Sequence, residues 1–327
     1  MNASNGMTAS DREDLYPSRK GGQALVIPRK DPVVHSSLDS SLDARSGAGT
    51  AIPAASPGAG EPGPLSRAQL ERYEEHGYLA FDAILSVDSL REIQARADAL
   101  REGAAVEGRS DPEIIREPES DEIRSIFAVH EQDPVFARIL RAPGLVATAE
   151  QILGGPAYIH QSRINYKPGF VGREFYWHSD FETWHVEDGM PRIRAFSISI
   201  SLTENQALNG PVMVIPGSHR KFVSCPGWTP DEHYRTSLRR QENGVPPREI
   251  LSRLVEEGGV ESPTGPPGSA LFFDCNLMHG SNGNITPFPR TNLFVVFNSM
   301  ENALEAPFSG QPPRPDYIGT RDPQPLG

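Results

Sequence analysis

Residues 193–202 read IRAFSISISL, and this run determines the fold class. Phe196, Ile198 and Ile200 alternate with serines. Successive side chains of a β-strand point to opposite faces of a sheet, so the run predicts a strand with one apolar face and one polar face. A polar inner face is unusual for a dry sandwich. The pattern therefore predicts a sheet that packs under helices on one side and lines a wet pocket on the other.

A second alternating run, YIHQSRINY at 158–166, places Gln161, Arg163 and Asn165 on one face of a predicted strand. Further strands are predicted at 77–81, 211–215, 270–273 and 291–297. In the last of these runs, Arg290 precedes the strand and shares a face with Asn292 and Phe294.

Helical signals are found before the strands. Ser66 and Gln69 form a capping box, Ser86 precedes an apolar pattern of helical spacing, and Asp133-Pro134 opens a third segment. Helices followed by many short strands predict a β-sandwich or jelly-roll barrel with flanking helices.

The chain has 327 residues and a net charge of -12. An acidic surface repels phosphate backbones and anionic lipids, so we expect neither nucleic acid nor membrane as a partner. The two cysteines, Cys225 and Cys275, are too few for a disulfide framework. The N-terminus lacks a signal-peptide pattern and no apolar run is long enough to cross a bilayer. We expect a cytoplasmic protein.

Composition divides the chain into three parts. Residues 1–64 form an N-terminal arm, with a Ser/Gly/Ala/Pro-rich flexible insert at about 36–63 that cannot bury enough apolar surface to fold. One domain spans about 65–310, and a Pro-rich tail follows at 311–327. The charged stretch 227–267 is interpreted as a surface excursion between strands.

The run FYWHSDFETWHVEDGMPRIR at 175–194 contains two candidate metal-binding residues. His178 and Asp180 are two positions apart, so on an extended strand their side chains project from the same face. His279, in LFFDCNLMHGSNGN, is the best third candidate for a two-His-one-carboxylate site that holds non-haem Fe(II). The alternative for the pair alone is a hydrogen-bonded strand-end histidine.

Other polar residues near these motifs have two interpretations each. Arg290 either binds a carboxylate with its fork or makes a strand-end salt bridge. Ser281 either adds a hydroxyl to that carboxylate or caps a turn. His219, in NGPVMVIPGSH, is expected to hydrogen-bond rather than bind metal because no acidic residue is near it. The pair His185 and Glu187 is not expected to bind metal, because the site already has three ligands.

Taken together, QSRINYKPG, WHSDFETWHVEDGMP, NGPVMVIPGSH and FFDCNLMHGSNGN with PRTN resemble the Fe(II)/2-oxoglutarate dioxygenases of the phytanoyl-CoA-hydroxylase-like branch. The WHSDFETWH stretch is most similar to the ectoine hydroxylase family within that branch. The resemblance covers most of the chain apart from about 36–63. It implies a double-stranded β-helix (a cupin-like jelly roll), a homodimer, and O2-dependent conversion of ectoine to 5-hydroxyectoine during osmotic stress.

The resemblance also implies roles for individual residues. His178, Asp180 and His279 would bind iron, and Arg290, Ser281, Asn165 and Phe127 would bind 2-oxoglutarate. Ectoine would contact Gln161, Trp184, Ser199, Phe273 and Phe294, and Arg314 in the tail would close over its carboxylate. The aromatic members are otherwise ordinary core residues, although aromatic faces also attract cations.

Two alternatives to this function remain open at the level of sequence. One is a hydroxylase of the same fold that acts on another small zwitterion, such as proline or an amino acid. The other is a non-catalytic metal-binding jelly roll or a zinc hydrolase, since zinc competes well for such ligands but does not activate O2.

Overall fold

The computed structural model describes residues 15–19, 21–35, 65–105, 111–240 and 242–326. The insert predicted at about 36–63 lies outside these residues. The described strands are β1 (Leu25–Pro28), β2 (Tyr78–Phe81), β3 (Ile114–Arg116), β4 (Ile123–Phe127), β5 (Ala157–Lys167), β6 (Phe175–His178), β7 (Ala195–Ser201), β8 (Val212–Val214), β9 (Lys221–Ser224), β10 (Ala270–Asp274), β11 (His279–Ser281) and β12 (Arg290–Ser299). The strands predicted from alternation correspond to β2, β5, β7, β8, β10 and β12.

The helices lie mostly before β5 and after β9. They are α1 (Arg67–His76), α2 (Val87–Ala104), α3 (Val129–Gln132), α4 (Pro134–Leu140), α5 (Pro143–Leu153), α6 (Asp180–Thr183), α7 (Tyr234–Ser237) and α8 (Arg248–Gly258), with a π-helix η1 (Trp184–Asp188) and 3-10 turns η2 (Ser218–Arg220) and η3 (Met300–Asn302). The predicted N-terminal signals are confirmed. Ser66 and Gln69 form the capping box of α1, Ser86 caps α2, and Asp133 accepts a hydrogen bond from Val135 N at the start of α4.

Seven strands form the larger sheet, in the order β2-β10-β7-β12-β5-β4-β3. Its two faces differ as the alternation predicts. Phe196, Ile198 and Ile200 of β7 are buried in the main core, against apolar residues of α1, α2, α4 and α5. The opposite face presents the serines of β7 and the polar residues of β5. The helices therefore cover one side of the sheet and leave the other for a pocket.

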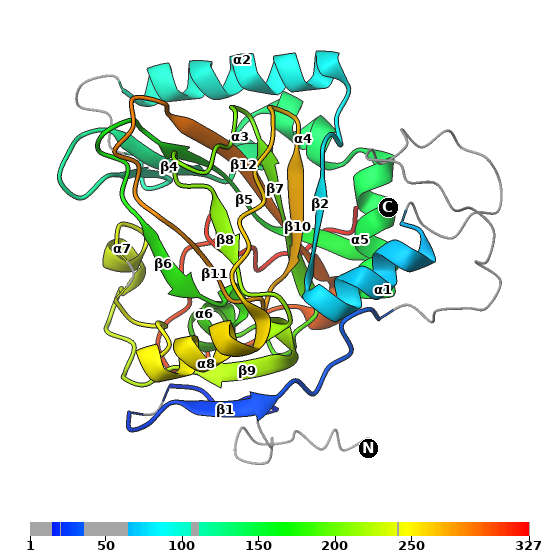
Figure 1. Cartoon of the computed structure of the whole chain (residues 1–327), viewed down its shortest axis with the longest axis vertical. Coiled ribbons are helices and arrows are strands. Elements are labelled where there is room, and N and C mark those ends of the chain that lie inside the picture. The colour runs from blue at the N-terminus through cyan, green and yellow to red at the C-terminus, as the bar shows by residue number, and fades with distance from the viewer. Residues whose placement is uncertain (1–14, 20, 36–64, 106–110, 241, 327) are drawn as a thin grey trace, which may run out of the picture.

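A smaller sheet, β6-β11-β8, packs against the pocket face of the larger one (Figure 1). Val212 and Val214 of β8 share an apolar cluster with Leu271, Phe273 and Phe294 from the larger sheet. Two sheets facing each other around a core are the arrangement of a jelly roll. The predicted double-stranded β-helix with flanking helices is confirmed.

The described parts of the arm and the tail pack onto this barrel. β1 of the arm pairs with β9, and the ring of Tyr16 is fully buried. In the tail, Ile318 is also fully buried, and its neighbours lie close to β5, since Thr320 N donates to His160 O over 3.0 Å. Both ends of the described chain are therefore packed against the barrel.

The interpretation of 227–267 as a surface excursion was wrong in part. Helix α8 buries Ile250, Leu251 and Leu254 in a cluster with Ile215 and Val223. Their i, i+1, i+4 spacing is that of an amphipathic helix, which explains why this charged stretch has a buried side.

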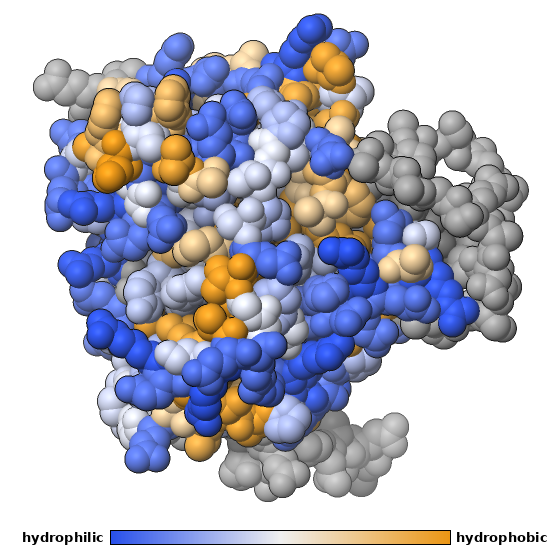
Figure 2. Space-filling view, viewed as in Figure 1, coloured by the Kyte–Doolittle hydropathy of each residue, from blue (hydrophilic) through white to orange (hydrophobic). Residues whose placement is uncertain are grey.

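Hydrophilic residues cover most of the face shown in Figure 2, interrupted by small apolar areas. Among the described helices, none has both the length and the apolar character needed to cross a membrane.

Candidate active site

Three side chains that can bind a metal converge between the two sheets. The ligand atoms of His178, Asp180 and His279 all lie within 4.8 Å of one another. Nε2 of His178 is 3.6 Å from Asp180 Oδ1, and Nε2 of His279 is 3.8 Å from Asp180 Oδ2. The predicted trio is therefore assembled from three separate elements.

Strand pairing explains how residues so distant in sequence meet. His178 is the last residue of β6 and His279 the first of β11, and the two are paired directly in the antiparallel register. Their rings are 4.3 Å apart between centroids. Adjacent strands thus supply both imidazoles.

The local geometry predicted for Asp180 was wrong. The strand stops at His178, and Asp180 is the first residue of α6 rather than a strand residue. Ser179 caps this short helix, because its hydroxyl accepts a hydrogen bond from Glu182 N over 3.3 Å. Asp180 still faces His178, but a strand-to-helix turn brings it there.

Both imidazoles are oriented by backbone carbonyls. Nδ1 of His178 lies 2.6 Å from Tyr176 O, and Nδ1 of His279 lies 3.0 Å from Leu277 O. A carbonyl accepts only, so each Nδ1 carries the proton and each Nε2 lone pair faces Asp180. Fixing the tautomer in this way is the usual support of metal-binding histidines. This donor set fits ferrous iron in a facial triad.

The electrostatics keep His279 and Asp180 ready for a cation. Burial together with the neighbouring His178 lowers the pKa of His279 to about 4, so its imidazole is neutral near pH 7. Burial alone would raise the pKa of Asp180, but the adjacent His279 and His178 outweigh it and hold that pKa below its usual value. A neutral imidazole and an ionised carboxylate bind metal without first losing a proton.

Buried histidines also predict a pH dependence of stability. Burial lowers the pKa of His130, His160, His219 and His279 from 6.5 to about 4. Between these values the unfolded chain binds more protons than the folded one, so the unfolding free energy must fall as pH decreases. We expect the urea midpoint of the metal-free protein to decline steadily from pH 6.5 to pH 4. A flat midpoint across that window would contradict these pKa values.

A buried cationic cradle lies beside the metal-binding trio. Arg290 is the first residue of β12 and faces Lys167 of β5 in the register. Both side chains are about 1% exposed. Among the described residues, Nε and Nη1 of Arg290 have no hydrogen-bond partner. Buried donors without acceptors are costly, and two opposed cations repel each other. A dicarboxylate bound here would accept hydrogen bonds from Arg290 and offset the repulsion between the two cations.

Lys167 was missed by the sequence reasoning. Its ammonium donates to Ser281 Oγ over 2.7 Å and to Asn282 O over 2.5 Å. Burial and the charges of Arg290 and Arg124 hold its pKa well below the ordinary value. A signal was present in the sequence, since Lys167 continues the face of Gln161, Arg163 and Asn165 by the same period of two.

The other predicted cosubstrate residues lie nearby. Ser281 bonds to Lys167, as described, and Asn165 pairs with Asn292 of β12. Asn165 Oδ1 accepts a hydrogen bond from Ser125 Oγ over 2.7 Å, and Phe127 lies two residues further along β4. The structure therefore places Arg290, Asn165 and Phe127 on the larger sheet, and Ser281 of the smaller sheet reaches them through Lys167.

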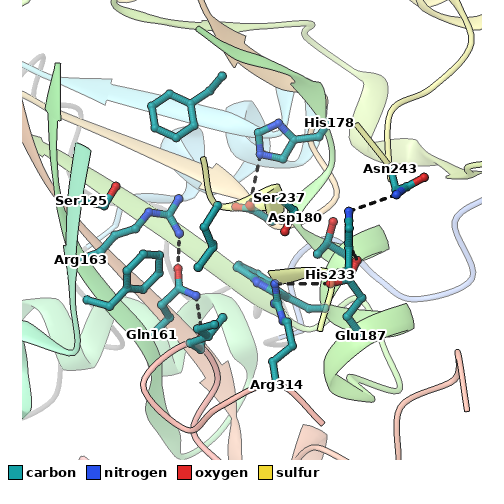
Figure 3. A pocket seen from close by; sticks show the side chains of 16 residues that line it. Ser125, Gln161, Arg163, His178, Asp180, Glu187, His233, Ser237, Asn243 and Arg314 are labelled. Atoms are coloured by element: carbon teal, nitrogen blue, oxygen red, sulfur yellow. Dashed lines mark hydrogen bonds and ion pairs between the residues drawn. The ribbon is translucent and has the colours of Figure 1, made fainter. Parts of the chain in front are cut away.

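A pocket opens beside the metal trio, and His178 and Asp180 are part of its lining. Arg163 and Gln161 form one side of it, and Glu187, His233 and Arg314 form the other (Figure 3). Its lining includes the predicted residues Phe127, Gln161, His178, Asp180, Trp184 and Arg314.

The remaining predicted residues stand behind this lining. Phe273 packs against His279 with ring centroids 4.8 Å apart. Phe294 and Ser199 are paired between β12 and β7, and the Phe294 ring lies 5.1 Å from the Arg163 guanidinium carbon. They support the wall of the pocket from the large sheet.

Arg314 is buried and points into the pocket, but its fork is already engaged. It makes two hydrogen bonds to the Asp188 carboxylate, at 2.7 and 2.5 Å. Nη1 is 3.8 Å from Glu187 Oε2. The tail is therefore fastened to the π-helix η1 at the edge of the pocket.

Sequence reasoning overlooked several pocket residues besides Lys167. Arg163 was placed on the correct face but given no role, and His233 belongs to the stretch interpreted as a surface excursion. His233 Nδ1 lies 3.0 Å from Glu187 Oε1, and Nε2 lies 3.1 Å from Asn243 Nδ2. A lone histidine in a charged loop has no pattern that marks it as buried, so no local signal identified it.

His219 and His185, which were not expected to bind metal, both make hydrogen bonds to the backbone. Nε2 of His219 lies 3.2 Å from Glu74 O. His185 has Nδ1 2.8 Å from Met190 O and Nε2 3.0 Å from Tyr16 O, and so faces carbonyls rather than a metal site.

Comparison with known proteins agrees with this geometry. Residues 73–292 match the phytanoyl-CoA dioxygenase (PhyH) family. This chain belongs to that family. The match includes the smaller sheet, most strands of the larger sheet and all three candidate iron ligands.

Individual relatives within the family are much closer. The chain is 49% identical over 310 residues to an ectoine dioxygenase from Sphingopyxis alaskensis, with 94% of each chain covered. It is similar to the crystal structure of EctD from S. alaskensis with 2-oxoglutarate and 5-hydroxyectoine, at 46% identity and a TM-score of 0.78, covering 94% of this chain and 95% of that one. EctD with bound Fe matches at 45% identity and a TM-score of 0.79, covering 96% and 97%. The family resemblance inferred from sequence is confirmed.

Proposed function

We propose that this chain hydroxylates ectoine to 5-hydroxyectoine. The reaction would consume O2 and 2-oxoglutarate and release succinate and CO2, with one oxygen atom entering each organic product. The observation that carries the proposal is the 46% identity, over 94% of this chain, to an EctD that was crystallised with 2-oxoglutarate and 5-hydroxyectoine. The iron and cationic sites described above match the needs of that chemistry.

Each group in the site has a proposed task. His178, Asp180 and His279 hold Fe(II), which with bound 2-oxoglutarate supplies the activation of O2. Arg290 and Lys167 bind the distal carboxylate of 2-oxoglutarate, because both are buried cations and Arg290 has donors in need of acceptors. Ser281, Asn165 and Phe127 fix its orientation.

Ectoine would occupy the pocket between Gln161 and Trp184, with Phe273, Phe294 and Ser199 behind them. Aromatic faces suit its delocalised cation, with an attraction of about 0.5–2 kcal/mol per contact. We propose that Arg314 contributes to the recognition of the substrate carboxylate from the tail. Enclosure by the tail and the 227–267 loop would exclude water from the reacting atoms.

The proposal includes the organisation of the chain and its setting. Residues 65–310 form the dioxygenase domain, with 1–64 and 311–327 as extensions. We propose a cytoplasmic enzyme of compatible-solute synthesis under osmotic stress, in keeping with two cysteines that are unpaired and buried. We also propose a homodimer, which sedimentation analysis of the purified protein would test.

The direct test is mass spectrometry of ectoine after incubation with the protein, Fe(II), 2-oxoglutarate and O2. We expect a product with one added oxygen and one succinate per product. Proline and other small zwitterions are the comparison substrates. Faster turnover of one of these would overturn the assignment of ectoine, and succinate release with no hydroxylated product from any of them would overturn hydroxylation itself.

A further inference from the structure

The helical segment after Asp180 has an unusual geometry. It begins as α6 and continues as the π-helix η1 from Trp184 to Asp188, closed by a hydrogen bond from Gly189 N to Trp184 O, five residues back. π-helical turns are rare and occur mostly at functional sites. Trp184 and Glu187, both in η1, line the pocket. The register of this turn therefore decides where two pocket residues lie.

A single buried guanidinium bridges two carboxylates across this turn. Arg19 Nε and Nη2 donate to Glu182 over 2.8 and 2.5 Å, and Nη1 donates to Glu187 over 2.7 Å. The three side chains are 0%, 1% and 3% exposed, so water does not screen the pairing. Gly244 covers the pair, since a Cβ there would come within 2.5 Å of Arg19 Nη2.

The spacing of these carboxylates is informative. Glu182 and Glu187 are five residues apart, and in a regular α-helix such residues lie about 140° apart around the axis. The π turn from Trp184 to Asp188 widens the helix between them and so reduces this offset. One planar fork that grips both therefore favours the π register over the α register.

Arg19 comes from the arm, outside the domain that carries the metal trio. Tyr16 accompanies it, with its ring 5.2 Å from that of Phe181 and its carbonyl 3.0 Å from His185 Nε2. The start of α6 has separate anchors, because Phe181 N donates to Cys275 O over 2.8 Å and Ser179 Oγ donates to Asn276 over 3.1 Å. The arm thus contacts both α6 and η1, while the start of α6 also has anchors of its own at Cys275 and Asn276.

We propose that Arg19 is a positioning residue, which holds the π turn and so places Trp184 and Glu187 in the substrate wall of the pocket. The inference rests on the proposed function. It predicts that loss of the fork weakens substrate binding and leaves iron binding intact. A misplacement of about 1 Å can lower a reaction rate by about 100-fold. We expect the affinity for ectoine to fall at least about tenfold.

The test uses Arg19→Lys and Arg19→Met, with Arg29→Met as the matched control. Arg29 is on the same arm and also makes a buried ion pair, 2.7 Å from Asp274, but it does not touch the π-helix. Ectoine affinity is measured by anaerobic calorimetry on the Fe(II)/2-oxoglutarate-loaded protein. Iron affinity, thermal midpoint and hydroxylated product per succinate are measured alongside.

We expect both Arg19 variants to lose ectoine affinity at least about tenfold and to release succinate in excess of product, with iron affinity close to wild type. Arg29→Met should lose thermal stability but keep its ectoine affinity and its coupling. Hydrogen exchange should increase across 181–190 only in the Arg19 variants.

Three results would overturn the proposal. One is an Arg19→Lys protein with wild-type ectoine affinity, because an ammonium cannot span both carboxylates. Another is a loss of ectoine affinity in Arg29→Met equal to that in the Arg19 variants. The third is a parallel loss of iron. If Arg19→Met does not fold, the charged Arg19→Lys decides. Failure of the wild-type protein to bind ectoine would instead reject the proposed function.

Discussion

Replacing Asp180 with alanine is expected to abolish iron binding and product formation, each by more than about 100-fold. Residues that only support a metal ligand cost about 10–100-fold when removed, and Asp180 supplies the only carboxylate of the His178–Asp180–His279 cluster. Two neutral imidazoles remain in the variant, and they would favour other metals without restoring turnover. Iron binding is measured by anaerobic titration and activity by product formation.

The control for this variant is His219→Gln, which alters a buried histidine outside the metal cluster. The folded His219→Gln protein should keep the iron affinity and turnover of the wild type. The metal-free Asp180→Ala protein should also be folded, because the change removes a buried charge rather than creating one. A folded Asp180→Ala protein that still hydroxylates ectoine with added iron would remove Asp180 from the ligand set.

Replacing Arg290 with alanine is expected to raise the 2-oxoglutarate requirement by about 100-fold or more, with iron affinity retained. Hydrogen bonds to charged groups contribute about 1.5–3 kcal/mol each, and a bidentate fork makes two of them. At about 1.4 kcal/mol per tenfold, this loss corresponds to at least two orders of magnitude. The measurement is the apparent KM for 2-oxoglutarate at saturating ectoine.

The buried guanidinium also predicts an unusual stability effect. Arg290 has unpartnered donors among the described residues, and burial, with Arg124 nearby, lowers its pKa to about 10. Arg290→Met should therefore leave the thermal midpoint of the cosubstrate-free protein unchanged or higher, while stabilisation by added 2-oxoglutarate is lost. A large drop in that midpoint together with an unchanged KM would show that Arg290 is structural and that the anchor lies elsewhere.

The large sheet was predictable because its alternation is local. The serines of β7 and the face shared by Arg290, Asn292 and Phe294 follow from a period of two, and the register confirms that face by pairing Arg290 with Lys167 and Asn292 with Asn165. Which strands would become neighbours is not local information. The meeting of His178 and His279 was inferred from residue type and from the family resemblance rather than from any strand-pairing signal.

The turn at Asp180 was mispredicted although a signal existed. Ser179 and Glu182 have the Ser-x-x-Glu spacing of a helix start, and the structure uses Ser179 as the cap of α6. The H-x-D spacing suited a strand equally well, and it was given the greater weight. Either geometry brings the two ligands together, which is why the site prediction survived an incorrect local structure.

The remaining omissions have a common physical cause. Lys167, Arg19 and His233 are polar residues that become buried only because distant segments cover them. Single charged residues are usually exposed, so sequence alone gives no reason to bury them. Their partners lie far away in the chain; Arg19, for example, meets Glu182 across 163 positions.

The central claim is that two imidazoles and one carboxylate from β6, α6 and β11 hold ferrous iron next to the cationic cradle. The most direct measurement is anomalous diffraction at the iron edge from crystals grown anaerobically with Fe(II) and 2-oxoglutarate. The account predicts one iron peak within bonding distance of His178 Nε2, Asp180 and His279 Nε2, with 2-oxoglutarate reaching Arg290. An iron peak bound to other side chains, or these three side chains pointing apart, would contradict it.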